Sequence, residues 1–112
     1  MLNQVVLVGR LTSDPAAIEL EGGHKKSLFN VAVPRSFKNS NGEYETDFIR
    51  CVLWDAIATS TCEYCKKGDI VGIKGRIQTR DVEFEDETKK KYVEVIAEKV
   101  TFLSSKRQEE AE

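Results

Sequence analysis

Apolar and polar residues alternate through most of the chain, and this period of two predicts strands rather than helices. Residues 4–11 read QVVLVGRL, and the Thr-Ser-Asp-Pro that follows at 12–15 is typical of a turn. In LFNVAV, residues 28–33, the large apolar side chains again alternate, and Pro34 is expected to weaken or bend the strand. The first third of the sequence therefore predicts two strands.

The third predicted strand returns from a hairpin. Asn41-Gly42 lies in a polar segment, 35–47, and is the strongest short hairpin signal in the chain. The run that follows, FIRCVLW at 48–54, is apolar except for one arginine. We expect this run to pair with the strand before the turn.

The pattern changes after Asp55, a residue type that often caps the start of a helix. Residues 56–65 contain few β-branched hydrophobic side chains, Lys66 and Lys67 suit the last turn of a helix, and Gly68 suits the position just beyond it. These features predict one helix over residues 56–67.

Two further strands follow the predicted helix. DIVGIKGRIQTR (69–80) and YVEVIAEKVTFL (92–103) flank a polar hairpin tip. Three strands, one helix and two strands predict an all-β fold, the five-stranded Greek-key barrel called the OB-fold, with its α-helix between strands 3 and 4. We expect one domain over residues 1–104 and a flexible acidic tail over 105–112.

The run FIRCVLW divides into two faces, because side chains alternate across a strand. One face is wholly apolar and suits a core: Ile49, Cys51 and Leu53. The other face carries rings and a charge: Phe48, Arg50, Val52 and Trp54. A buried arginine without a partner would be very costly, so we expect the second face to meet solvent or a ligand.

The strand predicted within residues 69–80 repeats this arrangement. Its apolar side carries Val71, Ile73, Gly75 and Ile77. Its opposite side carries Lys74, Arg76, Gln78 and Arg80, and continues to Val82 and Phe84. A second patch of similar chemistry flanks the predicted hairpin: Phe37, Lys38 and Tyr44. Rings that accept unpaired bases, together with cations that follow the backbone, suit single-stranded nucleic acid.

These residues also have an ordinary structural interpretation. Rings on strands pack more often than they bind a ligand, and outward charges are often only solvated. The nucleic-acid interpretation is favoured because rings and cations share one face on two strands, while a separate apolar face is left for the core.

The composition is that of a soluble globular protein with an uneven charge distribution. Among 112 residues, 40% are hydrophobic and 32% are charged, and the formal net charge is −2. Residues 1–80 hold 11 Lys and Arg against 9 Asp and Glu, whereas residues 81–112 hold 6 against 10. The early apolar run is too short for a membrane span, and three cysteines do not make a disulfide framework, so we expect a cytoplasmic protein without a membrane partner.

The motif CEYC, Cys62 to Cys65, raises the alternatives of a metal site or a redox pair. Structural zinc needs four ligands, and only Cys51 and His24 remain to complete the set. A redox pair usually lies at a helix N-terminus, whereas these cysteines come at the end of the predicted helix. Small core side chains are the better account, so we expect no metal or cofactor. No nucleotide-binding loop or nucleophile motif indicates an enzyme.

Several blocks of the sequence, in order, resemble those of the bacterial single-stranded DNA-binding protein family. The blocks are MLNQVVLVGRLTSDP, FNVAVPRSFKNSNGEYETDFIRCVLW, YCKKGDIVGIKGRIQTR and YVEVIAEKVTFL. They cover nearly the whole chain. The resemblance implies an OB-fold that assembles as a homotetramer and wraps single-stranded DNA without sequence preference during replication, recombination and repair.

The resemblance also implies roles for individual residues. The family's stacking rings fall on Phe37, Phe48 and Trp54. Its basic positions near the DNA fall on Arg50, Lys67 and Arg80. The predicted site is completed by further basic residues: Arg35, Lys38, Lys74 and Arg76.

The chain departs from the family pattern in three places. Val82 stands where many members have Trp or Tyr, and we expect Phe84, on the same face, to substitute in part. Asp81 and Ile18-Glu19 replace residues that are often basic or aromatic, so a lower affinity is expected. The sequence ends in QEEAE rather than a long tail with an acidic tip, so recruitment of replication proteins is not expected. This ending would be explained by a short paralogue, of the kind used in DNA uptake or encoded by phages and plasmids. A shortened chain would explain it equally.

Two function classes follow from the sequence. The first is sequence-independent binding and protection of single-stranded DNA. The alternative is an OB-fold protein-interaction subunit of a replication-restart complex, in which the exposed rings form a partner interface.

Overall fold

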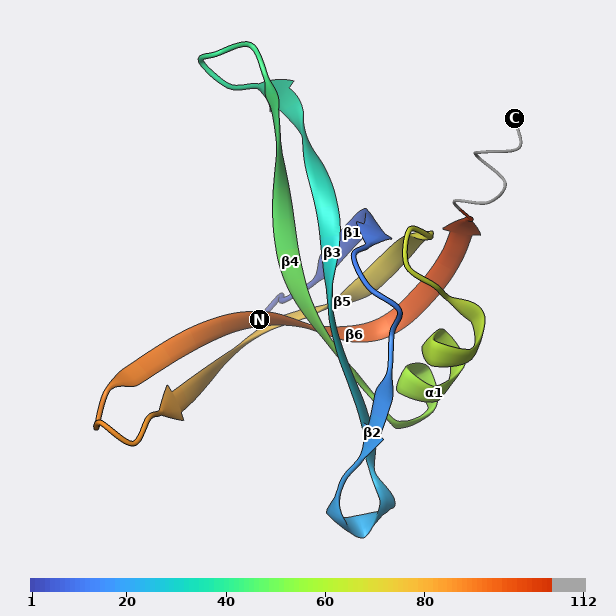
Figure 1. Ribbon diagram of the computed structural model, residues 1–112, viewed down its shortest axis with the longest axis vertical. Coiled ribbons are helices and arrows are strands. Elements are labelled where there is room, and N and C mark those ends of the chain that lie inside the picture. Colours follow the sequence, from blue (N-terminus) through green and yellow to red (C-terminus); the bar gives the residue numbers. More distant parts are fainter. Residues whose placement is uncertain (106–112) are drawn as a thin grey trace.

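The computed structural model describes residues 1–105, which form six strands and one α-helix (Figure 1). The elements are β1 (Val5–Leu11), β2 (Ala17–Glu19), the 3₁₀ turn η1 (Glu21–Gly23), β3 (Lys25–Lys38), β4 (Tyr44–Trp54), α1 (Asp55–Tyr64), β5 (Ile70–Glu83) and β6 (Lys89–Ser104). Residues 106–112 of the predicted tail lie outside the described residues.

The sheet closes on itself to form a barrel. The strand order is β1-β5-β6-β4-β3, and β1 also pairs with β3, where Arg10 faces Ala32 and Leu11 faces Val31. The short strand β2 extends β3 as a hairpin outside this barrel. The predicted five-stranded barrel, with its helix between the third and fourth barrel strands, is confirmed. β2 was not predicted, because three residues are too few to show an alternating pattern.

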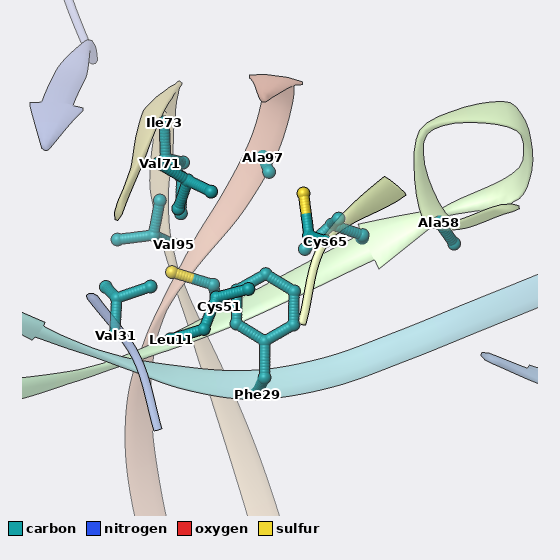
Figure 2. Packing of buried hydrophobic residues seen from close by; sticks show 11 residues of the cluster. Leu11, Phe29, Val31, Cys51, Ala58, Cys65, Val71, Ile73, Val95 and Ala97 are labelled. Carbon is teal, nitrogen blue, oxygen red and sulfur yellow. The ribbon is translucent and has the colours of Figure 1, made fainter. Parts of the chain in front are cut away.

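The interior of the barrel is filled by apolar side chains from all five strands and from the helix (Figure 2). The cluster consists of Leu11, Phe29, Val31, Cys51, Leu53, Ala58, Cys65, Val71, Ile73, Val95 and Ala97. Both predicted core faces therefore reach the core. Ile77 is an exception and remains half exposed, beyond the end of the β1–β5 ladder at Val5 and Gly75.

Three hairpins extend outward from the barrel: β2–β3, β3–β4 and β5–β6 (Figure 1). In the β3–β4 hairpin, Pro34 pairs with Thr46, and the ladder shifts register between Pro34 and Lys38. The proline therefore disturbs the ladder without ending the strand. The predicted turn at its tip is confirmed: Gly42 has φ of +78°, and the N–H of Asn39 donates to the carbonyl oxygen of Glu43 over 2.8 Å.

The start of α1 corrects the prediction that Asp55 caps the helix, since its side chain makes no capping hydrogen bond. The carboxylate instead accepts the N–H of Lys25 over 3.1 Å and lies 3.3 Å from Nδ1 of His24. The Lys25 N–H, and then His24, hold the pKa of Asp55 below its usual value. Asp55 thus ties the helix start to the β2–β3 hairpin.

The helix ends at Tyr64, earlier than predicted. Cys65 is extended and buried in the core, and the turn after it is closed by the N–H of Lys66, which donates to Oδ2 of Asp69 over 2.8 Å. Gly68 lies in this turn with φ of +92°, and its N–H donates to the carbonyl oxygen of Leu11 over 2.9 Å. The segment that leads into β5 is therefore fixed to β1.

Gly75 lies at a close approach of β5 and β6. The ladder shifts register between Lys74 and Gly75, and a Cβ atom placed on Gly75 would overlap the carbonyl oxygen of Ile96. Gly72, on the same strand, has more room, since the nearest atom to its Cβ position is a Leu103 methyl group at 3.7 Å. The close approach therefore requires glycine at position 75 and not at position 72.

We expect Gly75→Ala to lower the free energy of unfolding by about 2 kcal/mol or more, because backbone atoms of β6 would have to move. Gly72→Ala is the matched control and should change it by less than about 1 kcal/mol. Urea denaturation followed by circular dichroism measures both variants. Equal stability of the two would contradict the steric argument.

Candidate nucleic-acid interface

The outward sides of β3, β4, β6 and β5 form one continuous surface, because these strands are neighbours in the sheet. Across it, Leu28 faces Val52, Val52 faces Ile96, and Ile96 faces Arg76. We call this surface the outer face. Its residues are Leu28, Asn30, Phe48, Arg50, Val52, Trp54, Arg76, Gln78, Arg80, Tyr92, Glu94 and Ile96.

Two predicted stacking rings lie on the outer face and not in the core. Phe48 is 67% exposed and Trp54 is 39% exposed. Nζ of Lys26, on β3, lies 5.3 Å from the centre of the Trp54 ring. Val52 lies between the two rings but is only 2% exposed, so the prediction that it meets solvent or a ligand is wrong. It is buried because its neighbours across both adjacent strands are also apolar.

Arg50, the arginine in the middle of FIRCVLW, has a buried acidic partner. Its Nε lies 3.0 Å from Oε2 of Glu94, which is only 5% exposed. Nε of Arg80 lies 3.6 Å from the other oxygen, Oε1, of the same carboxylate. The Cζ atoms of Arg50 and Arg80 also lie 5.3 and 5.8 Å from the centre of the Tyr92 ring. One acid and one ring therefore hold two arginines of the outer face.

The β3–β4 hairpin carries the second predicted patch. Phe37 and Tyr44 are both well exposed, and Nζ of Lys38 lies 5.7 Å from the centre of the Tyr44 ring. This patch lies toward the tip of the hairpin, beyond the barrel (Figure 1).

Arg35 is held by acidic side chains of β4. Its Nε and Nη2 donate to the two carboxylate oxygens of Asp47 over 3.0 and 2.9 Å, and its Nη1 donates to Glu45 over 2.6 Å. The hydrogen bond from Arg35 lowers the pKa of Asp47, and the same bond raises the pKa of Arg35. Alternation along β4 places Asp47 and Glu45 on the side of the hairpin opposite Phe48. The charge of Arg35 is therefore already neutralised, away from the outer face.

The other predicted basic residues occupy different places. Nη1 of Arg76, on the outer face, lies 4.0 Å from Oε2 of Glu98. Lys74 faces Val6 across the β1–β5 ladder. Lys67 follows α1, and its backbone N–H donates to Oδ1 of Asp14 over 2.8 Å.

Phe84 lies at the tip of the β5–β6 hairpin, where its N–H donates to the carbonyl oxygen of Thr88 over 2.8 Å. Its side chain is half exposed. The structure therefore brings together Phe48, Trp54, Arg50, Arg76 and Arg80 on the outer face. It places the remaining predicted residues on the hairpins or at the barrel margin: Arg35, Phe37, Lys38, Lys67, Lys74 and Phe84.

The sequence prediction missed Lys26, Tyr92 and Glu94. The alternation of YVEVIAE does place Tyr92 and Glu94 on one side of a strand, so a signal for the outer face was present. What the sequence did not show is the short parallel pairing of β6 with β4, which brings Glu94 beside Arg50.

Of the two cysteines of CEYC, Cys65 belongs to the core and Cys62 is partly exposed. Cys65 is buried, and Sγ of Cys62 lies 3.7 Å from Oγ of Ser27. Within residues 1–105, no group of His, Cys, Asp and Glu side chains is arranged to hold a metal ion. The same residues contain no helix long and apolar enough to cross a membrane.

The sequence model of the Single-strand binding protein family matches residues 2–103. The chain belongs to this family. The Single-stranded DNA-binding protein B of Bacillus subtilis (strain 168) is 46% identical over 111 residues, which cover 99% of this chain and 98% of that relative. A member from Oceanobacillus iheyensis, named Single-stranded DNA-binding protein, is 48% identical over 106 residues, which cover 95% of this chain and 66% of that relative.

A solved structure of another single-strand binding protein has the same fold. It is described as "Plasmodium falciparum SSB complex with ssDNA", and it superposes with a TM-score of 0.82 at 28% identity, covering 93% of this chain and 97% of that chain. The predicted family resemblance is confirmed. Single-strand binding proteins are DNA-binding proteins and not enzymes, which agrees with the prediction that this chain is not an enzyme.

The three thiols of this single-strand binding protein are expected to react at different rates. Burial raises the pKa of Cys51 to about 12. Burial, and then the nearby Asp69 and Cys62, raise the pKa of Cys65. Because the thiolate is the reactive form, a thiol reagent at about pH 8 should label Cys62 first in the folded protein, and the other two only after denaturation. Peptide mass spectrometry checks this order, and equally rapid labelling of Cys65 would contradict it.

Proposed function

We propose that the protein binds single-stranded DNA without sequence preference on its outer face. Phe48 and Trp54 would stack with bases, and Arg50, Arg76 and Arg80 would contact phosphates. The observation that carries the proposal is the gathering of exposed rings and arginines on one side of β4 and β5, while the opposite sides of these strands fill the core.

The magnitudes favour stacking as a major source of affinity. A stacked base contributes about 1–3 kcal/mol, and stacking accepts every base because each has a flat face. Cations add a contribution that follows the phosphates and weakens with salt. The formal net charge of −2 does not oppose this role, because residues 1–80, which carry the exposed rings and arginines of the outer face, hold 11 Lys and Arg against 9 Asp and Glu.

The proposed path of the DNA continues from the outer face onto the hairpins. Phe37 and Lys38 would extend it along β3–β4, and Phe84 would extend it along β5–β6. Lys67 and Lys74 would provide phosphate contacts at the margins of the barrel. Arg35 is not included, because three of its five N–H donors already bond to Asp47 and Glu45, and its proposed role is to stiffen the β3–β4 hairpin.

We also propose a cytoplasmic, nucleoid-associated role in DNA replication, recombination, repair or uptake, carried out by a homotetramer. The family and the names of the bacterial relatives support such a role. Self-association is supported by the apolar side chains that β1 exposes, Val6 and Val8.

Fluorescence of Trp54, the single tryptophan, provides the direct test. Oligo(dT) is expected to quench it, with an affinity that falls as salt rises, and light scattering on the same samples reports the oligomeric state. Phe48→Ala should weaken binding about five- to 150-fold, the equivalent of one stacked base. Tyr64→Ala, which removes a 74% exposed ring on α1, is the matched control and should bind like the wild type. No response to oligo(dT) from an intact oligomer would favour the protein-interaction subunit instead.

Phe84→Ala is expected to weaken oligonucleotide binding, because Phe84 is proposed to substitute for the Trp or Tyr that many family members have at the position of Val82. The loss should be up to about tenfold for oligonucleotides long enough to reach the hairpin tip, and smaller for short ones. Val93→Ala changes an exposed apolar residue on the opposite side of the same hairpin and is the control. Titrations with oligo(dT) of several lengths measure both, and unchanged affinity of Phe84→Ala at every length would remove Phe84 from the site.

A further inference from the structure

Glu94 is a buried acid on a face proposed to bind a polyanion. Only 5% of Glu94 is exposed, and it lies on β6 between the strands that carry Arg50 and Arg80. A buried carboxylate is costly unless it is paired, and this one has two cationic partners. Its presence needs explanation, since its charge repels the phosphates that the neighbouring arginines would attract.

The contacts of Glu94 use the inner nitrogen of each arginine. Each of its oxygens lies near one Nε, at 3.0 Å for Arg50 and 3.6 Å for Arg80. Nε of Arg50 is completely buried and has no well-aligned hydrogen-bond acceptor, so the ion pair is what offsets its burial. One third of the Arg50 side chain and 41% of the Arg80 side chain nevertheless remain exposed. The outer nitrogens, Nη1 and Nη2, are therefore left to meet an anion.

Tyr92 provides the second support for the same pair of arginines. Both guanidinium groups lie within 6 Å of its ring centre, at 5.3 and 5.8 Å, a distance at which the ring attracts a cation. Each guanidinium is thus held at its inner nitrogen by Glu94 and lies over the ring of Tyr92. Two long, flexible side chains from different strands are fixed before any ligand arrives.

We propose that Glu94 is a positioning residue that holds Arg50 and Arg80 ready to bind the DNA backbone. The proposal rests on the proposed function. An arginine that is already ordered loses less side-chain freedom on binding, so its contact with a phosphate contributes more to affinity. In this protein that gain exceeds the loss caused by the negative charge of Glu94.

The sign of the effect of Glu94→Gln distinguishes positioning from simple charge. If Glu94 acted only through its charge, its removal would tighten binding to oligo(dT). If it positions the arginines, the variant binds at least about fivefold more weakly, because two side chains must be ordered at the moment of binding. The dependence of affinity on salt should also become shallower, by roughly 0.7 in the slope for each phosphate that the arginines no longer neutralise.

Glu98→Gln is the matched control. Glu98 lies on the same strand, and its carboxylate is 4.0 Å from Arg76, but both side chains of this pair are about half exposed. Exposed pairs at this distance hold a side chain only weakly. Removing this charge should leave binding unchanged or make it slightly tighter, with no shallower salt slope. The two variants have the same net charge and are expected to differ in affinity, with only Glu94→Gln binding more weakly than the wild type.

Glu94→Asp keeps the charge and shortens the side chain. It therefore tests whether the carboxylate must contact the two arginines, separately from the effect of its charge. Weaker binding by this variant supports positioning, and wild-type binding overturns it. Circular dichroism and unfolding curves establish that each variant is folded. Loss of the fold in both Glu94→Gln and Glu94→Asp would assign Glu94 a purely structural role and overturn the proposal.

The wild type serves as the reference for the proposed function itself. Failure of the wild type to bind oligo(dT) would contradict the proposed function. Binding by the wild type, with equal or tighter binding by Glu94→Gln and an unchanged salt slope, would remove only the positioning role of Glu94.

Discussion

The barrel closes at two short seams, β1 with β3 and β4 with β6, and the outward position of Phe48 and Trp54 depends on them. At the first seam a Cβ atom on Gly9 would lie 2.7 Å from the carbonyl oxygen of Ala32, so the two backbones meet without a side chain between them. At the second, Ile96 pairs with Val52 on one side and is approached by Gly75 on the other. Once both seams are closed, the alternating residues that cannot enter the core must face outward.

The outer face combines two kinds of stabilisation. Val52 and Ile96 form a buried apolar patch on the same face as Trp54 and Phe48, while Arg50 meets Glu94 beside it. Burial of the apolar patch stabilises the fold, and the ion pair allows the Arg50 side chain to be partly buried without an unpaired charge. This answers why an arginine interrupts an otherwise apolar strand: it is matched by an acid from a strand more than forty residues later.

Short-range patterns were sufficient to predict the five barrel strands, the Asn41-Gly42 turn and the two faces of β4, because alternation and turn chemistry act between near neighbours. Predictions failed where a distant partner decided the outcome. Asp55 bonds to the β2–β3 hairpin instead of capping α1, and Val52 is buried where it faces Leu28 and Ile96 on the neighbouring strands. The network around Glu94 was missed for the same reason, since no local signal indicates that β6 lies parallel to β4.

The short seam between β4 and β6 affects how readily the barrel opens locally. Only two residue pairs join β4 to β6 within residues 1–105, Cys51 with Val95 and Val52 with Ile96. The Arg50–Glu94 ion pair also connects these two strands. A DNA strand bound across the outer face, as proposed, would connect β4 to β6 and hold the two sides of the barrel together. Because a ligand that binds only the closed barrel favours that state by mass action, bound molecules would open less often, and the amides at this seam would exchange with solvent more slowly as occupancy rises.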